Sequence, residues 1–69
     1  MKLPTEQQGH EANRRGQADA LAGRDRDAGP WDPRSADSVE RCLALAYQGG
    51  YGYGLQVALQ RDFGDPPTA

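Results

Sequence analysis

The stretch Tyr47-Gln48-Gly49-Gly50-Tyr51-Gly52-Tyr53-Gly54 decides how the rest of the chain is interpreted. It contains all three tyrosines and four of the nine glycines, and it lies inside the long apolar segment from Val39 to Leu59. A glycine inside a helix costs about 0.8–1 kcal/mol relative to alanine, so a group of four needs a structural reason. Close approach of another backbone, or a bend in the chain, supplies such a reason.

The size of the chain limits its architecture. It has 69 residues, of which 36% are hydrophobic, and many of these are alanine. A chain of this length forms one small domain at most and is only marginally stable alone. Cys42 is the only cysteine, so no intrachain disulfide can form and a reducing compartment is expected. Association with a larger partner, or with a second copy, is the remaining way to bury more surface.

Hydropathy and charge exclude some classes of protein. The N-terminus lacks the apolar core of a signal peptide, and no run reaches the ~18 apolar residues of a membrane span. We therefore expect a soluble, cytoplasmic protein with no membrane partner. The net charge of −2 argues against a protein that binds nucleic acid through overall positive charge. Six arginines nevertheless lie between positions 14 and 41, interleaved with aspartates. They form either a solvated, ion-paired surface or a local basic patch.

The first helix has one strong start signal. Thr5 and Gln8 have the spacing of a capping box, which marks a first helical turn. Gly9 weakens that turn, so a start near Glu11 is the alternative. We accordingly divide the chain into a partly ordered segment, a two-helix domain and a disordered tail, over residues 1–10, 11–64 and 65–69.

Small residues recur at helical spacing along this first helix: Ala12, Gly16, Ala20 and Gly23. They share one face, and a face of small residues allows a second helix to come close. Arg15 and Asp19 are four residues apart, which predicts an ion pair on the helix surface. Gly23 is also well placed to end the helix.

Residues 24–34 are predicted to form a linker, because they are strongly polar and contain Pro30 and Pro33. Trp31 lies between these prolines. It either folds back to cover the helix pair or stacks on a ligand or an unpaired base.

The second helix is predicted to begin within Ser35–Ser38. Asp37 and Glu40 have the spacing of a cap reinforced by a reciprocal carboxylate. Apolar residues then continue at helical spacing to Leu59, and Phe63-Gly64-Asp65-Pro66 is a stop signal. One helix, kinked or straight, is favoured over two short helices with a hinge at residues 49–54.

The fold class that these patterns predict is all-α. The stretch Tyr51-Gly52-Tyr53-Gly54-Leu55 alternates as a strand does, but glycine is poor in strands and no second strand exists to pair with it. We expect two antiparallel helices, a helical hairpin, joined by the linker that contains proline and tryptophan. The small face of the first helix should meet the glycines of the second at close range.

Catalytic and metal-binding patterns are absent from the sequence. His10 and Cys42 do not form a zinc ligand set with the scattered carboxylates. The glycines lack the lysine and spacing of a phosphate-binding loop. Asp25 and Asp27 are the one pair of neighbouring carboxylates, and they lie in an arginine-rich linker. We therefore predict no enzymatic activity, no cofactor and no metal.

Two motifs together suggest a family. The run from Arg15 to Arg24 is followed by Gly29-Pro30-Trp31 and later by Tyr47-Gln48-Gly49-Gly50-Tyr51. This order resembles the ribosome modulation factor family of short bacterial two-helix proteins, which carry R-G-x-x-A-x-x-A-G-R, C-P-Y and W-x-G-G-W type patterns. The matching residues are Arg15, Gly16, Gly23 and Arg24 in the first motif, and Tyr47, Gly49, Gly50 and Tyr51 in the last, with tyrosine for tryptophan.

The resemblance implies a stress-response function. A protein of that family binds the ribosomal RNA of the small ribosomal subunit and modulates translation. The candidate contacts are phosphate-binding arginines and a base-stacking tryptophan, namely Arg14, Arg15, Arg24, Arg26 and Trp31. The alternative is a phage- or plasmid-borne regulator or inhibitor that binds a protein, or forms a homodimer, through Tyr47, Tyr51 and Tyr53.

Overall fold

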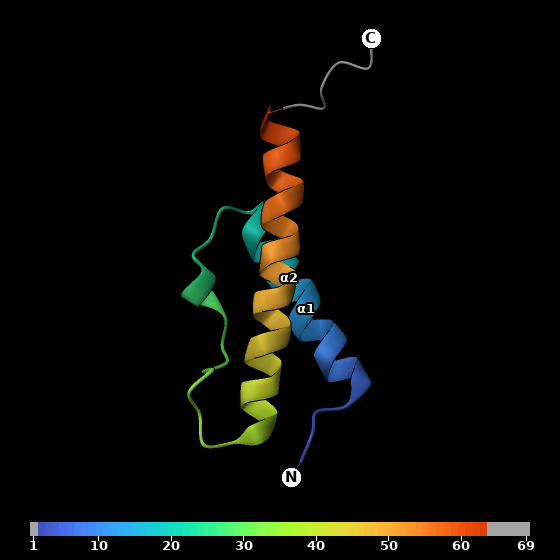
Figure 1. Ribbon diagram of the computed structural model, residues 1–69, viewed down its shortest axis with the longest axis vertical. Helices are drawn as coiled ribbons and strands as arrows, with labels where there is room; N and C mark the ends of the chain where they lie inside the picture. Colours follow the sequence, from blue (N-terminus) through green and yellow to red (C-terminus); the bar gives the residue numbers. More distant parts are fainter. Residues whose placement is uncertain (1, 64–69) are drawn as a thin grey trace.

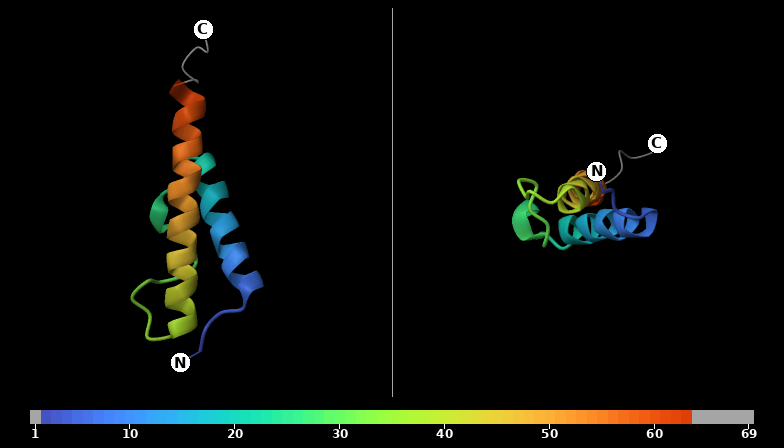
Figure 2. Two further views of the ribbon diagram at one scale, coloured as in Figure 1. Left: turned by 45° about the vertical axis from the view of Figure 1, so that its right-hand side comes forward. Right: turned by 90° about the horizontal axis from the view of Figure 1, so that it is seen from below.

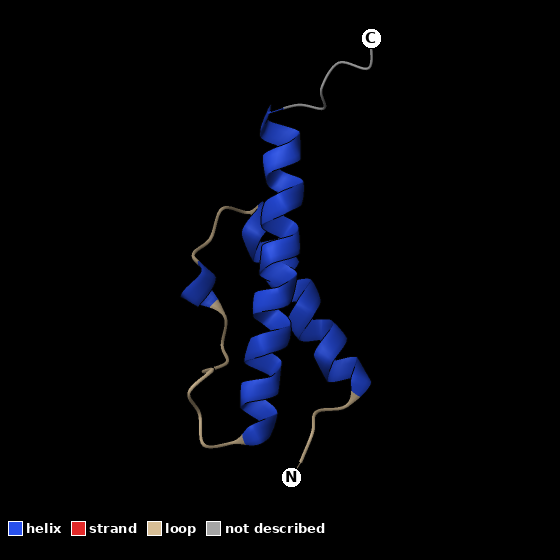
Figure 3. Ribbon diagram, in the orientation of Figure 1, coloured by secondary structure: helices blue, strands red, loops and turns tan. Residues whose placement is uncertain are grey.

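The computed structural model describes residues 2–63 of the chain. It contains a helix α1 over Glu6–Leu21, a short 3₁₀ helix η1 over Arg26–Ala28 and a long helix α2 over Ser38–Phe63 (Figure 1). The described part has no strand (Figure 3), and the two α-helices pack on each other. The predicted all-α pair of helices is confirmed. The disordered tail predicted for residues 65–69 lies outside the described residues.

The start of α1 follows from a complete capping box. The Gln8 backbone N–H donates to Thr5 Oγ1 at 3.1 Å, and the Thr5 backbone N–H donates to Gln8 Oε1 at 2.9 Å. These two bonds satisfy backbone donors that have no partner within the helix. The helix therefore begins at Glu6 rather than at Glu11.

The end of α1 is a Schellman motif built on Gly23, whose φ of 74° is readily adopted only by glycine. The Gly23 N–H donates to the carbonyl of Ala20 at 3.1 Å, and the Arg24 N–H donates to the carbonyl of Asp19 at 2.9 Å. Gly23 thus ends the helix as predicted, and it is exposed instead of extending the buried stripe. The motif reverses the chain direction so that Arg24 lies beside the last turn of α1, close to Asp19.

The start of α2 is capped by Asp37, whose Oδ1 accepts from the Val39 N–H at 3.0 Å. The predicted reciprocal bond from Glu40 is wrong. Glu40 Oε2 instead accepts the N–H of Asp32 in the linker at 3.0 Å, so the carboxylate anchors the linker. From Ser38 the helix continues unbroken through residues 49–54, which confirms one helix and excludes a hinge there.

Three glycines lie where the helices touch: Gly16 of α1, and Gly50 and Gly54 of α2. A Cβ atom on Gly16 would overlap the carbonyl oxygen of Tyr47. A Cβ atom on Gly50 would overlap the carbonyl oxygen of Asn13 in the same way. The backbones of the two helices are therefore in direct contact, and the predicted close crossing is confirmed. The core around it is small: Ala12, Ala20, Leu43, Ala44 and Tyr47.

The two helices run in the same direction, so the predicted antiparallel arrangement is wrong. The Asn13 side chain donates to the carbonyl of Ala46 at 3.2 Å, whereas Gln17, one turn later, lies beside Gly54. Contacts therefore advance together along both helices. Both helices also begin at the same end of the molecule and splay apart there (Figures 1 and 2). At that end Ser38 Oγ donates to the carbonyl of Lys2 at 2.7 Å.

The linker over residues 22–37 explains the parallel direction. It has as many residues as α1, and an extended chain covers about 3.3 Å per residue whereas a helix rises about 1.5 Å. The linker can therefore span the length of α1 in the reverse direction, and Figures 1 and 2 show it descending beside α2 to the start of that helix. Arg41 Nη1 donates to the carbonyl of Ser35 at 2.7 Å and fixes the end of the linker on α2. A short loop would have required antiparallel neighbours.

Helix α2 is much longer than α1 and continues alone past its end (Figure 1). In the part of the chain that the structure describes, neither helix combines the length and apolarity needed to cross a bilayer.

Candidate functional site

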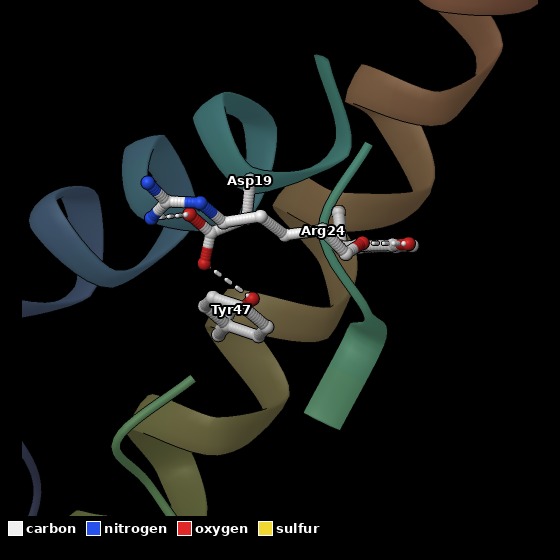
Figure 4. Close-up of polar contacts among 4 residues, drawn as sticks. Asp19, Arg24 and Tyr47 are labelled. Carbon is white, nitrogen blue, oxygen red and sulfur yellow. Dashed lines mark hydrogen bonds and ion pairs between the residues drawn. The ribbon is translucent and has the colours of Figure 1, made fainter. Parts of the chain in front are cut away.

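A buried polar network joins the end of α1 to the middle of α2 (Figure 4). Asp19 is only 4% exposed, and it is the buried charged residue among those described. The Tyr47 hydroxyl donates to Asp19 Oδ2 at 2.6 Å. Arg24 Nη1 donates to Asp19 Oδ1 at 3.4 Å from the solvent side. Both carboxylate oxygens therefore have a partner, as a buried charge requires.

The predicted ion pair between Arg15 and Asp19 is wrong, since Arg24 is the partner within 4.0 Å in the described part of the chain. Asp19 lies three residues after Gly16, so it shares the face that meets α2 and turns away from solvent. The feature of the sequence that could have indicated a buried carboxylate is an acidic residue on a helix face of small residues. A tyrosine opposite such a face supplies the hydroxyl that the carboxylate needs.

Burial, the hydrogen bond to Asp19 and the negative charge of that carboxylate raise the pKa of Tyr47 from 10.0 to about 12, against a smaller opposing effect of Arg15. The first cause acts because the phenolate would lose its hydration in this site. The hydrogen bond to Asp19 raises the pKa because the phenol needs its proton to donate this bond. The charge of Asp19 raises it because a phenolate beside the carboxylate would be repelled. The folded chain thus holds the neutral phenol well into alkaline pH.

This pKa gives a stability prediction. Below pH 10 both the folded and the unfolded chain keep the Tyr47 proton, so the contribution to stability is complete. As the pH rises from 10 towards 12, the unfolded chain loses the proton first, so the free energy of unfolding falls. Urea denaturation across this range should show a loss in the natural chain that Tyr47→Phe lacks. Equal pH dependence in both chains would contradict the assignment.

An aromatic layer covers the network on the linker side. The rings of Trp31 and Tyr47 are 6.1 Å apart between centroids, and those of Tyr47 and Tyr51 are 6.3 Å apart. The Tyr51 hydroxyl donates to the carbonyl of Arg24 at 2.7 Å. Gly29 crosses the Tyr47 ring so closely that a Cβ atom would lie 3.0 Å from it. Trp31 therefore folds back over the helix pair, which is the first of the two positions predicted for this residue.

Beside this layer a surface pocket of about 310 Å³ lies between the linker and α2. Trp31 and Tyr47 form apolar walls, while Arg26, Gln48 and the carboxylates Asp27 and Asp32 contribute polar side chains. The Arg26 guanidinium lies 5.6 Å from the centre of the Tyr51 ring, a cation–π distance. Gln48 is not among the predicted site residues, and no pattern in the sequence indicates it. It lines a pocket only because the linker passes next to this part of α2.

The structure brings some of the predicted residues together and separates others. Arg24, Arg26 and Trp31 surround the network and the pocket. Arg14 and Arg15 are exposed on α1 and line a second surface hollow of about 420 Å³ with Glu11 and Ala18.

The three tyrosines predicted as partner contacts have three different positions. Tyr47 is only 3% exposed and is held inside by Asp19 and the linker, so its ring is not offered to a partner. Tyr51 is half-buried, and Tyr53 is 61% exposed on the side of α2 away from α1. Tyr53 is thus the tyrosine available on the surface.

Possible metal and redox residues are scattered. His10 Nε2 lies 4.0 Å from Glu6 Oε1 on the exposed side of α1, and Cys42 is a half-buried free thiol. Within residues 2–63, no three histidine, cysteine or acidic side chains gather where they could bind a metal.

Comparison of the chain with protein-family models, curated proteins and solved structures finds no match.

Proposed function

We propose that the protein is a non-enzymatic regulator that binds ribosomal RNA of the small subunit at the linker face, which we define as Arg24, Arg26, Trp31 and Gln48. The observation that carries the proposal is the pocket whose lining brings together an indole, a guanidinium and an amide, beside the carboxylates of Asp27 and Asp32. The resemblance to ribosome modulation factors supports the same partner.

The chemistry of the linker face suits an unpaired base. Trp31 is partly buried, and the part of its side chain that remains exposed offers a surface for stacking, which contributes about 1–3 kcal/mol per base. The Gln48 amide offers both a donor and an acceptor to a base edge. Arg26 supplies the positive charge for the adjoining phosphate.

The electrostatic component of this binding is small. Asp25, Asp27 and Asp32 lie in the same linker, and the chain carries a net charge of −2. Arg24 and Arg26 belong to the site, so about two phosphates are contacted. For single-stranded RNA this gives a slope of about −1.4 in a plot of log K against log salt concentration. Stacking must then supply most of the affinity.

Binding to small ribosomal subunits, measured by co-sedimentation and by titration of single-stranded ribosomal RNA fragments, tests the proposal. We expect Trp31→Ala to weaken binding about tenfold, since one stacked base is lost. Arg26→Gln should make the salt slope less steep by about 0.7. Arg61→Gln makes the same change of charge in the last turn of α2, far from the pocket, and should leave the slope almost unchanged.

A protein that stays in the supernatant at low salt would refute the proposal. So would equal losses for Arg26→Gln and Arg61→Gln, because the linker face would then have no special part in binding.

A specific observation favours a second candidate, a regulator that binds a protein. Tyr53 and Leu45 are 61% and 63% exposed on α2, and such side chains are good interface contacts. Affinity purification with and without RNase separates the two candidates. A stoichiometric protein partner that resists RNase favours the second, whereas loss of the partner with RNase favours the first.

A further inference from the structure

The side of α2 turned away from α1 is unusually poor in charge. We define the outward face of α2 as six exposed residues: Leu45, Gly49, Gly52, Tyr53, Gln56 and Leu59. No charged residue occurs between Arg41 and Arg61, although 26% of the chain is charged. Leu45 and Tyr53 are more than three-fifths exposed, and Leu59 is 47% exposed. Depletion of charge around exposed apolar and aromatic side chains is typical of an interface.

Two glycines on this face have no role in the crossing with α1. A Cβ atom on Gly52 would meet nothing within 4 Å among the described residues, and one on Gly49 would make an ordinary contact of 3.9 Å with Asn13 Nδ2. Each costs the helix about 0.8–1 kcal/mol relative to alanine. Gly16 and Gly50 are required by the backbone contact between α1 and α2. Gly49 and Gly52 would be explained in the same way if a helix of another molecule came close to this face.

The spacing of the outward face indicates what approaches. Leu45, Gly49, Gly52, Gln56 and Leu59 follow one another at intervals of four, three, four and three residues. This is the period of a helix that packs along another helix. The two leucines are also placed symmetrically, since each lies seven residues from Gly52. In two such helices that run in opposite directions and cross at Gly52, Leu45 of each helix therefore lies opposite Leu59 of the other.

We propose that two copies of the chain associate through the outward faces of α2, antiparallel, about a two-fold axis at Gly52. Leu45 of each copy then packs against Leu59 of the other. The small residues at the axis let the two backbones come close, as the glycines of the α1–α2 crossing already do. The opposed directions of the helices also place their dipoles favourably.

Charge favours a second copy as the occupant. Two identical chains of net charge −2 repel each other wherever their charged surfaces meet. In a two-fold interface the same patch meets itself, so a patch without charge avoids this repulsion. The seam from Leu45 to Leu59 is about 21 Å long, because a helix rises about 1.5 Å per residue. A single helix seam of this length lies at the low end of interface sizes, where association is weak and reversible.

This inference does not rest on the proposed function. The outward face of α2 is separate from the linker face, and association is measured without RNA.

Sedimentation equilibrium over a range of protein concentrations tests the association. Leu45→Lys and Leu59→Glu should each raise the dimer dissociation constant at least tenfold. The double variant should recover affinity, because the antiparallel register places the two opposite charges together across the interface. Within one chain these positions are too far apart to compensate for each other. Leu3→Lys is the matched control, since Leu3 is 69% exposed outside α2.

Gly52→Gln tests the close approach separately. The side chain enters open space in the single chain, so the monomer keeps its fold, as circular dichroism should show. In the dimer it separates the two helices, and we expect the dissociation constant to rise at least tenfold. A monomer at every concentration up to millimolar overturns the proposal. A dimer unchanged by Leu45→Lys and Gly52→Gln, or a double variant no better than its parents, also overturns it.

Discussion

Gly50→Ala unfolds the protein, or lowers its free energy of unfolding by at least about 3 kcal/mol. The added methyl group would overlap the carbonyl oxygen of Asn13. A backbone atom has no rotamer by which to move aside, so the two helices must separate and the core opens. A domain of this size has a total stability of only about 5 kcal/mol, so most of it is lost. Urea denaturation followed by circular dichroism measures the loss.

Gly9→Ala is the matched control for this prediction. Gly9 also lies in a helix, but a Cβ atom there would meet nothing within 4 Å among the described residues. We expect the free energy of unfolding to rise by about 0.5–1 kcal/mol, because alanine favours the helix. If Gly50→Ala behaved as Gly9→Ala does, the two helices would not be in backbone contact.

Asp19→Ala has the second largest expected effect, a loss of about 2–4 kcal/mol in the free energy of unfolding. The substitution leaves the buried hydroxyl of Tyr47 without its acceptor and opens a small void between the helices. It also releases Arg24, but that side chain is 64% exposed and returns to water at little cost. Thermal and urea denaturation of the variant measure the loss.

A double-mutant cycle separates the two bonds of Asp19. Tyr47→Phe and Asp19→Asn, alone and together, should give a coupling energy of about 1.5–3 kcal/mol, the usual range for a hydrogen bond to a charged group. Arg24→Gln should cost less than about 1 kcal/mol. A larger loss for Arg24→Gln than for Tyr47→Phe would show that the ion pair, rather than the phenol, holds the carboxylate.

Local chemistry predicts much of this fold. The bonds of Thr5, Gly23 and Asp37 are made within a few residues, so their spacing in the sequence is sufficient to find them. The crossing is also predictable, because glycines at helical spacing destabilise a helix unless another backbone comes close to them. Gly16 and Gly50 indeed meet the opposite backbone.

The direction of the helices and the partner of Asp19 could not be predicted in this way. Direction depends on the path of the linker, and the interactions that fix it, such as Glu40 to Asp32, leave no periodic pattern. Helical spacing predicts Arg15 as the partner of Asp19. That rule holds for an exposed side chain, whereas the tertiary contact with Tyr47 turns this carboxylate inward.

The candidate site was predicted in part for the same reason. Its position between two prolines predicts that Trp31 either covers the helices or stacks on a base, and its place beside the ring of Tyr47 confirms the first of these. Gln48 is an ordinary helix residue in the sequence. It becomes a pocket residue only because the linker passes over it, and the sequence does not show that path.

The parallel course of the two helices also determines how the chain must fold. In a hairpin, contacts near the loop form first and the rest close in sequence. Here the hydrogen bonds that Asn13, Asp19 and Arg24 make to α2 span 33, 28 and 27 residues, so none of these three bonds is local. The crossing must form in one loop-closure step, which slows folding relative to a hairpin of equal length. The closure entropy grows only with the logarithm of loop length, so a longer linker would delay folding with little loss of stability.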